Sequence, residues 1–241
     1  MYQIEPKERE NGIVKASLGF NTITYRPLKF RMLDELGGGH LVMPIDGLVF
    51  YAPLNGNNVT AATGQILTTS GTVSYDIVNN VPCAYFNNSN INSAVSGLPT
   101  GGSARTISLW LKASNVRKSY MLSYGSEAGS RYCTLVISDS GYLLGFVAWG
   151  NDHQINTNYD LTKWTHYLAT YENGVLKLYV NGNQEKQIQI SLNTGSSNVY
   201  LGSRISNTEY FNGYIAAARI YDRVLTQDEI TLLSREFSPT E

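Results

Sequence analysis

The segment Trp149-Gly150-Asn151-Asp152-His153-Gln154 places one aromatic ring beside amide, carboxylate and imidazole groups. Ligand sites commonly combine an apolar or aromatic surface with a few polar groups that fix the orientation of the ligand. The segment is therefore a candidate carbohydrate-binding site, and the loop that contains Tyr210 is a weaker candidate of the same kind. An ordinary turn rich in Asn and Asp, with Trp149 packed into the core, is the alternative. The candidate binding residues are Trp149, Asn151, Asp152, His153, Gln154 and Tyr210.

The carboxylates of the chain do not follow the pattern of a glycoside hydrolase. Hydrolysis needs two carboxyl groups roughly 5 to 10 Å apart. Glu172 and Glu185 lie near turns and Glu209 lies in a loop, and none of them has a second acid two positions away on a strand. The three histidines are far apart and lack metal-ligand spacing, and nucleophile elbows, phosphate loops and dinucleotide motifs are missing. We therefore predict a protein that is not an enzyme and needs no cofactor.

The composition excludes several other functions. The formal net charge is -1, with Lys+Arg 18 and Asp+Glu 19, and no long basic run offers a binding surface for nucleic acid. No apolar run approaches the ~20 residues that cross a bilayer. The first ten residues carry charges where a signal peptide would be apolar, so we do not expect export by that route. Cys83 and Cys133 lie in apolar, strand-like segments that favour buried free thiols, with a disulfide left open.

Residues 164–182 predict the elements that would support such a site. Two runs rich in aromatic and β-branched residues flank Asn173-Gly174, a dipeptide suited to a type I′ turn because both residues tolerate φ > 0. Asn181-Gly182 indicates a second turn, followed by a strand over Gln184–Ile190. The alternation predicts a β-meander with one face on a core, in which His166 is a packed strand residue.

Similar patterns recur along most of the chain, and they indicate an all-β fold. We expect loops at Asn87–Gly102 and Trp149–Leu161, and a single helix over Thr226–Glu236. Thr226 and Glu229 have the spacing of a capping box. Strands with no βαβ alternation predict an antiparallel β-sandwich or jelly roll. The expected strands are Gly47–Leu54, Gln65–Thr68, Thr72–Tyr75, Cys83–Phe86, Arg105–Ala113, Tyr120–Tyr124, Tyr132–Ser138, Tyr142–Ala148, Asn198–Gly202 and Gly213–Asp222.

Residues 1–45 differ from the rest because they are richer in charge and could not close a core of their own. Asn21–Met32 could form one extended amphipathic strand interrupted by Pro27, and Gly37-Gly38-Gly39 has the composition of a hinge. This predicts an N-terminal docking arm on a domain formed by residues 46–241. An arm folded back on its own domain is the alternative. The expected contact residues of the arm are Tyr25, Arg26, Leu28, Phe30 and Met32.

Several motifs of residues 46–236 resemble one known family. They are Asp46–Asn57, Ala84–Asn87, Thr106–Lys112, Trp164–Gly182 and Phe211–Ile230. Together they resemble the concanavalin A-like lectin/glucanase superfamily in its laminin-G-like branch. The resemblance implies an antiparallel jelly-roll sandwich with a short C-terminal helix. It says little about activity, because this fold hosts lectins, adhesion modules, hydrolases and passive structural domains.

Two departures from the family bear on function. Many members carry an Asp shortly after the first turn, where it binds Ca²⁺, but residues 57–63 contain no carboxylate here. The oxygens of Asn55 and Asn57 alone would bind Ca²⁺ weakly, since a hard cation favours negatively charged oxygen ligands. The glucanase branch carries its acids as E-x-D-x-x-E on one strand, and that spacing does not occur in this chain.

A noncatalytic jelly roll with a docking arm is the layout expected of a phage head decoration, fibre or tail protein. We therefore expect a virion-surface protein, oligomeric in its assembly, that contacts other virion proteins through residues 1–36 and binds a host glycan. An exported bacterial carbohydrate-binding surface protein is one alternative. A glycoside hydrolase with unconventional carboxylates is the other.

Overall fold

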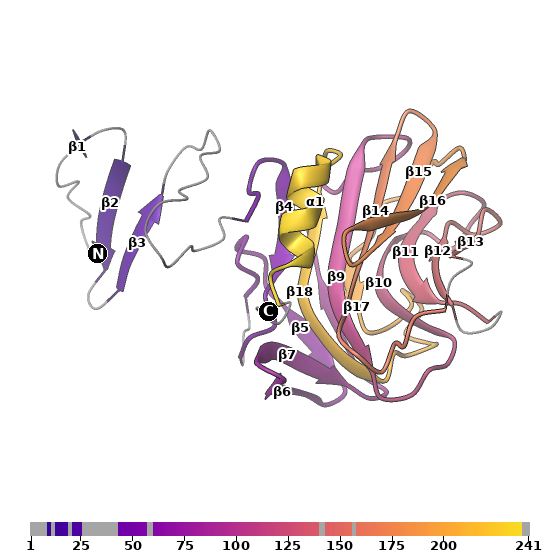
Figure 1. The fold of residues 1–241 in the computed structure, drawn as a ribbon, viewed down its shortest axis with the longest axis horizontal. Helices are drawn as coiled ribbons and strands as arrows, with labels where there is room; N and C mark the ends of the chain where they lie inside the picture. The colour runs from indigo at the N-terminus through magenta and orange to yellow at the C-terminus, as the bar shows by residue number, and fades with distance from the viewer. Residues whose placement is uncertain are drawn as a thin grey trace. The chain divides into compact units, whose positions relative to one another are not determined.

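The computed structural model describes residues 9–10, 13–18, 21–25, 43–56, 60–139, 143–155 and 158–237 (Figure 1). The chain divides into two units, Met1–His40 and Leu41–Glu241.

The first unit contains a small antiparallel sheet with the order β1 (Arg9–Glu10), β2 (Ile13–Leu18), β3 (Asn21–Tyr25). β3 matches the first five residues of the strand expected over Asn21–Met32, and residues 26–32 lie outside the described residues. β3 pairs with β2, a strand that was not expected. The two-residue connection between β2 and β3 is the usual length of a hairpin loop. Of the expected arm contacts, only the backbone of Tyr25 lies within the described residues.

The second unit is a sandwich of two antiparallel sheets, which confirms the predicted fold class. The seven-stranded sheet has the order β13 (His153–Gln154), β12 (Leu144–Val147), β11 (Tyr132–Ile137), β10 (Ser119–Gly125), β17 (Val199–Leu201), β8 (Asn90–Ser93), β5 (Thr68–Ser70). The eight-stranded sheet has the order β16 (Asn183–Gln189), β15 (Val175–Val180), β14 (Thr165–Glu172), β9 (Arg105–Ala113), β18 (Gly213–Tyr221), β7 (Val81–Phe86), β6 (Val73–Val78), and β4 (Leu48–Ala52) also pairs with β18.

Two strands lie in segments that we expected to be loops. β8 contains two asparagines and a serine, which have low strand propensity, but it pairs with β17 and β5 on either side. β13 has only two residues and pairs with the edge of β12. In both cases the neighbouring strands, rather than local propensity, determine the conformation.

The hairpin of β14 and β15 is confirmed together with its turn. Asn173 and Gly174 have φ of 50° and 79°, both positive as a type I′ turn requires. The expectation that only one face of this hairpin is buried is wrong. Tyr167 points into the core between the sheets, whereas Leu168 packs in a second cluster on the outer face.

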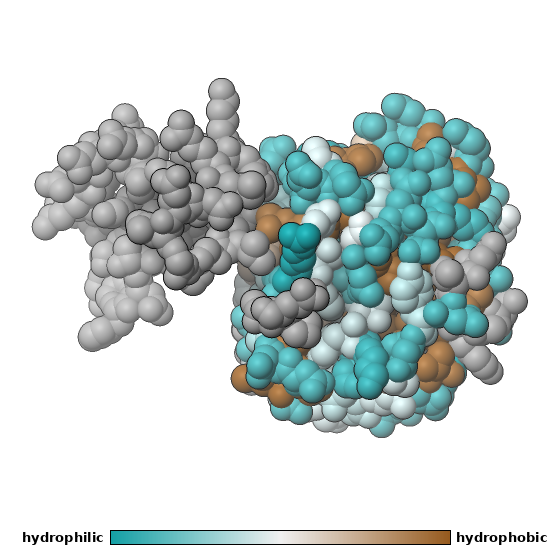
Figure 2. All heavy atoms as spheres, viewed as in Figure 1, coloured by the Kyte–Doolittle hydropathy of each residue, from teal (hydrophilic) through white to brown (hydrophobic). Residues whose placement is uncertain are grey.

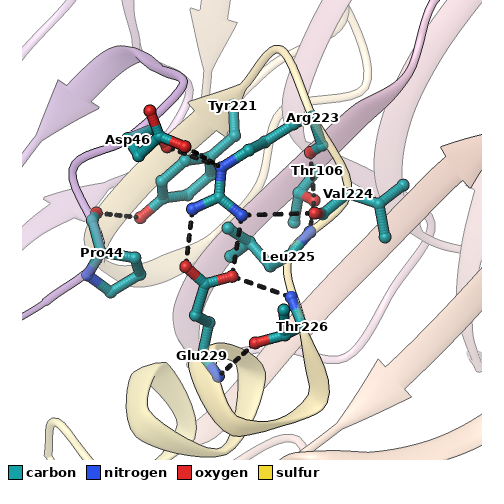
Figure 3. Close-up of polar contacts among 9 residues, drawn as sticks. All are labelled: Pro44, Asp46, Thr106, Tyr221, Arg223, Val224, Leu225, Thr226 and Glu229. Carbon is teal, nitrogen blue, oxygen red and sulfur yellow. Dashed lines mark hydrogen bonds and ion pairs between the residues drawn. The ribbon is translucent and has the colours of Figure 1, made fainter. Parts of the chain in front are cut away.

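The one helix among the described residues, α1 (Gln227–Ser234), covers that outer face (Figure 1). Ile230 and Leu233 of the helix pack with Leu168 and with Tyr221 of β18. Thr226 is the N-cap, and its hydroxyl and the side chain of Glu229 form the predicted capping box (Figure 3). The helix therefore explains why β14 is buried on both faces.

Both cysteines are buried free thiols, as preferred from the sequence. Burial raises the pKa of the Cys83 thiol to about 11. Cys83 and Cys133 are therefore protonated at neutral pH and pack as small apolar residues.

Candidate functional site

The two sheets meet at one edge, where β13 ends the seven-stranded sheet and β16 ends the eight-stranded sheet. The Nζ of Lys186 on β16 donates a hydrogen bond of 2.7 Å to the backbone carbonyl of Gln154 on β13. An open pocket of about 390 Å³ lies at this junction. Its lining residues are Val136, Ser138, Val147, Asp152, His153, Gln154 and Lys186.

Hydrogen bonds inside the protein orient the polar groups of this pocket. The hydroxyl of Ser138 donates to Oε1 of Gln154 at 2.9 Å, which leaves the NH₂ of that amide as a donor. Asp152 Oδ1 accepts from the backbone N–H of Ala148 at 3.2 Å and so closes the turn between β12 and β13. The pocket thus holds prepared donors and acceptors beside the methyl groups of Val136 and Val147.

The charges around His153 favour a neutral imidazole. Burial lowers the pKa of His153, and the positive charge of Lys186 lowers it further, against the opposing effect of Asp152. Nε2 of His153 is buried and has no hydrogen-bond partner among the described residues. Asp152 is the only carboxylate among the lining residues. The arrangement can hydrogen-bond a polar ligand but lacks the second acid that sugar hydrolysis needs.

The structure brings together three of the six candidate binding residues, namely Asp152, His153 and Gln154. Trp149 does not line the pocket. It is half-buried, its ring stacks under the guanidinium of Arg204 at 4.6 Å, and it meets the ring of Tyr132 at 6.4 Å. Its aromatic face is therefore covered by the protein itself.

Asn151 and Tyr210 also lie outside this pocket. Nδ2 of Asn151 donates to the hydroxyl of Ser130 at 2.6 Å, a contact that holds the loop rather than a ligand. Tyr210 forms an isolated parallel bridge with Tyr120 on β10.

Four lining residues were missed from the sequence: Lys186, Ser138, Val136 and Val147. Lys186 lies in the polar run of β16, which looks like any solvent-exposed edge strand. It faces Gln154 only because the edges of two different sheets converge, and no local pattern in the sequence carries that information.

Most of the remaining chemical candidates have structural partners among the described residues, and Glu172 is the exception. Glu172 is exposed at the hairpin, Glu185 accepts from the hydroxyl of Tyr159 at 2.5 Å, and Glu209 pairs with Arg204 and Lys118. His166 is fully buried, as expected, with Nε2 2.9 Å from the hydroxyl of Ser108. Burial and the nearby charge of Arg219 lower the pKa of His166 to about 3.

The described residues contain no cluster of three or more metal-ligating side chains. Asn57 lies outside the described residues, and the turn after Asn55 has no carboxylate up to Thr63, so the side chains present do not fit a calcium site. The absence of a cofactor stays a prediction. No helix in the described part of the chain has the length and apolar character to span a membrane.

The two antiparallel sheets form a jelly-roll sandwich, and the pocket lies where their edges meet. The family model described as the concanavalin A-like lectin/glucanases superfamily matches residues 86–231. That is more than half of the chain, and the chain therefore belongs to this family. A search of the curated proteins found no match.

Solved structures show the same fold. Domain 4 of AbnA, an extracellular GH43 arabinanase from Geobacillus stearothermophilus solved in complex with arabinotriose, is 22% identical with a TM-score of 0.64, and the match covers 78% of this chain and 98% of that one. The binding domain of botulinum neurotoxin serotype D/C is 16% identical with a TM-score of 0.63, and the match covers 80% of this chain and 53% of that one. The match thus spans about half of the toxin domain.

Proposed function

We propose that this chain is a noncatalytic adhesion protein that binds carbohydrate in the pocket between β13 and β16. The observation that carries the proposal is the convergence of Asp152, His153, Gln154 and Lys186 at the junction of the two sheet edges. Two neighbouring hydroxyl groups of a sugar both donate and accept hydrogen bonds. They can be bound by the groups of this pocket, which are a neutral imidazole, an oriented amide, an ammonium and one carboxylate.

Two structural neighbours support a carbohydrate ligand. The arabinanase domain is described in complex with arabinotriose, and a botulinum neurotoxin D/C binding domain is described in complex with SialylT. The single carboxylate of the pocket supports binding without hydrolysis, since turnover requires two.

Removing the pocket's polar groups should weaken glycan binding. We expect Lys186→Met and Asp152→Asn each to lower the affinity for the best ligand on a glycan array about tenfold, because each removes a charge-assisted hydrogen bond. Isothermal titration calorimetry with that glycan measures the change. Lys177→Met, on the neighbouring strand β15 and outside the pocket, is the matched control and should bind like the parent protein.

Methionine retains the apolar stem of Lys186, so a melting curve separates loss of binding from loss of folding. The proposal fails if no glycan on the array binds, or if both pocket variants bind as tightly as the control.

The finer part of the proposal concerns where the domain works. We place it on the surface of a virion, as a phage head decoration, fibre or tail protein, with residues 1–36 bound to other virion proteins. The division at His40 supports this, because the N-terminal segment forms a unit with a sheet of its own. An exported bacterial surface protein with the same glycan pocket is the alternative.

Deleting residues 1–36 should separate assembly from folding. The eight-stranded and seven-stranded sheets contain no strand from this segment, so the shortened chain should keep its unfolding midpoint and its glycan binding. Quantitative mass spectrometry of purified particles should find the full-length chain incorporated and the shortened chain missing. Equal incorporation of both would rule out the arm as the attachment device.

A further inference from the structure

Four side chains form a row across the outer face of the eight-stranded sheet, three of them on strands β7, β18 and β9 and the fourth just before β14. Tyr85 on β7 is directly opposite Tyr214 on β18, and Tyr214 is in turn opposite Lys112 on β9. Leu111 pairs with Thr165, so Trp164, which precedes β14, continues the row beyond Lys112. All four side chains are partly exposed. The row belongs to a different sheet from most of the pocket residues.

The three rings of this row lie close together but are not coplanar. The centroids of Tyr85 and Tyr214 are 4.9 Å apart with planes at 47°, and those of Tyr214 and Trp164 are 6.5 Å apart with planes at 54°. These separations are similar to the length of one pyranose ring. Successive tilts of the rings suit a chain of sugars that twists along its length rather than a flat crystalline surface.

Hydrogen bonds hold two of the three rings, those of Tyr85 and Trp164, in place before any ligand arrives. The hydroxyl of Tyr85 donates to Oδ1 of Asn212 at 3.3 Å, and Nδ2 of Asn212 donates to Oδ1 of Asn87 at 3.2 Å. The indole N–H of Trp164 donates to the carbonyl of Val78 at 2.9 Å. Rings that are already fixed lose little conformational entropy on binding.

Polar side chains border the rings. Lys112 lies between Tyr214 and Trp164 in the register, and its Nζ donates to the carbonyl of Thr162 at 2.5 Å. Ser74 pairs with Tyr85 in register, and Asp76, two residues along β6, shares its face; both are exposed. Amide, hydroxyl, ammonium and carboxylate groups thus lie within reach of the hydroxyl groups of a sugar stacked on the rings.

We propose that this row is a second carbohydrate-binding site, which takes a linear oligosaccharide along Tyr85, Tyr214 and Trp164. Sugar rings present C–H faces that pack on aromatic rings, while their hydroxyl groups project sideways to the polar border. A protein partner fits less well. In Figure 2, the visible described residues where α1 crosses this sheet are mainly hydrophilic, and hydrophobic residues occur in small separate groups.

The test is a titration of the full-length chain with cellohexaose, xylohexaose and mannohexaose, with glucose as the single-residue control. We expect at least one hexaose to bind, and glucose to bind undetectably, because only a chain of sugars contacts the whole row. Tyr85→Leu and Tyr214→Leu keep apolar bulk but remove the flat ring, and each should weaken binding about tenfold. Tyr200→Leu, at a partly exposed tyrosine of the other sheet, is the matched control.

The parent protein provides a readout that needs no variant. Its three tryptophans give separate indole N–H signals in NMR spectra, and the hexaose should shift the signal of Trp164 and leave that of Trp149, which packs in a different cluster under Arg204, in place. Lys186→Met should bind the hexaose normally, so failure of the edge pocket and failure of this row are distinguishable. The proposal is overturned if none of the hexaoses binds, or if binding survives both leucine variants without moving the Trp164 signal.

Discussion

Replacing Glu236 by Gln should lower the free energy of unfolding by about 3 kcal/mol, because it leaves a buried guanidinium without a counter-charge. Arg219 on β18 is only 2% exposed, and its two terminal nitrogens each lie 2.7 Å from an oxygen of Glu236. Burial alone would lower the pKa of Arg219, but the hydrogen bonds and the charge of Glu236, together with the nearby Tyr51 and Tyr221, raise that pKa above its usual value. The variant loses this support, but the arginine stays charged because a guanidinium is not deprotonated in proteins.

Urea denaturation measures this loss, and for a domain of this size the melting temperature should fall by roughly 10 °C. Glu172→Gln makes the same chemical change at an exposed hairpin position and should leave stability unchanged. The double variant Arg219→Met/Glu236→Leu should recover much of the loss, since neither buried charge remains. A double variant no more stable than Glu236→Gln would show that the loss came from packing instead.

The sequence predicts those features of this fold that are local. Asn173-Gly174 identifies its hairpin because few residues tolerate the turn, and Thr226 and Glu229 identify the helix start because a capping box is complete within four residues. The pair of Arg219 and Glu236 is not predictable in this way. The two residues lie on a central strand and on a turn after the helix, and only the packing of α1 on the sheet brings them together.

The candidate site also has a part that the sequence predicts and a part that it does not. Asp152, His153 and Gln154 are neighbours in the sequence, so their composition drew attention to them. Lys186 joins them across two sheets. Trp149 was expected either to bind sugar or to enter the core. It packs partly buried against the cluster of Tyr120, Tyr132 and Val136, and Arg204, a residue from a distant loop, lies over its ring. Side chains that meet through tertiary pairing leave no local signal.

The stability of the helix start should depend on pH through Glu229. Its two oxygens lie 2.6 and 2.8 Å from the guanidinium nitrogens of Arg223, and the second oxygen also accepts from the backbone N–H of Thr226 at 2.8 Å (Figure 3). The hydrogen bonds from Arg223, followed by that from Thr226, lower the pKa of Glu229 despite its partial burial. Arg223 also donates from Nε to the carbonyl of Asp46, so the carboxylate braces both the helix and the start of β4.

Glu229→Gln should therefore lower the free energy of unfolding by about 2 kcal/mol at pH 7. The amide carries no charge, and its NH₂ group cannot accept a hydrogen bond, so only one acceptor remains for Arg223 and Thr226. Because the folded-state pKa lies below the unfolded value, this stabilisation is complete above an unfolded pKa of about 4.3 and is lost as the pH falls through the folded-state pKa. The gap in unfolding free energy between the parent and the variant should accordingly narrow below that pH. Asp46→Asn is the control, because that side chain is 90% exposed and its ion pair with Arg223 is open to solvent. A gap that stays constant from pH 7 to pH 3 would mean that Glu229 acts through its shape alone.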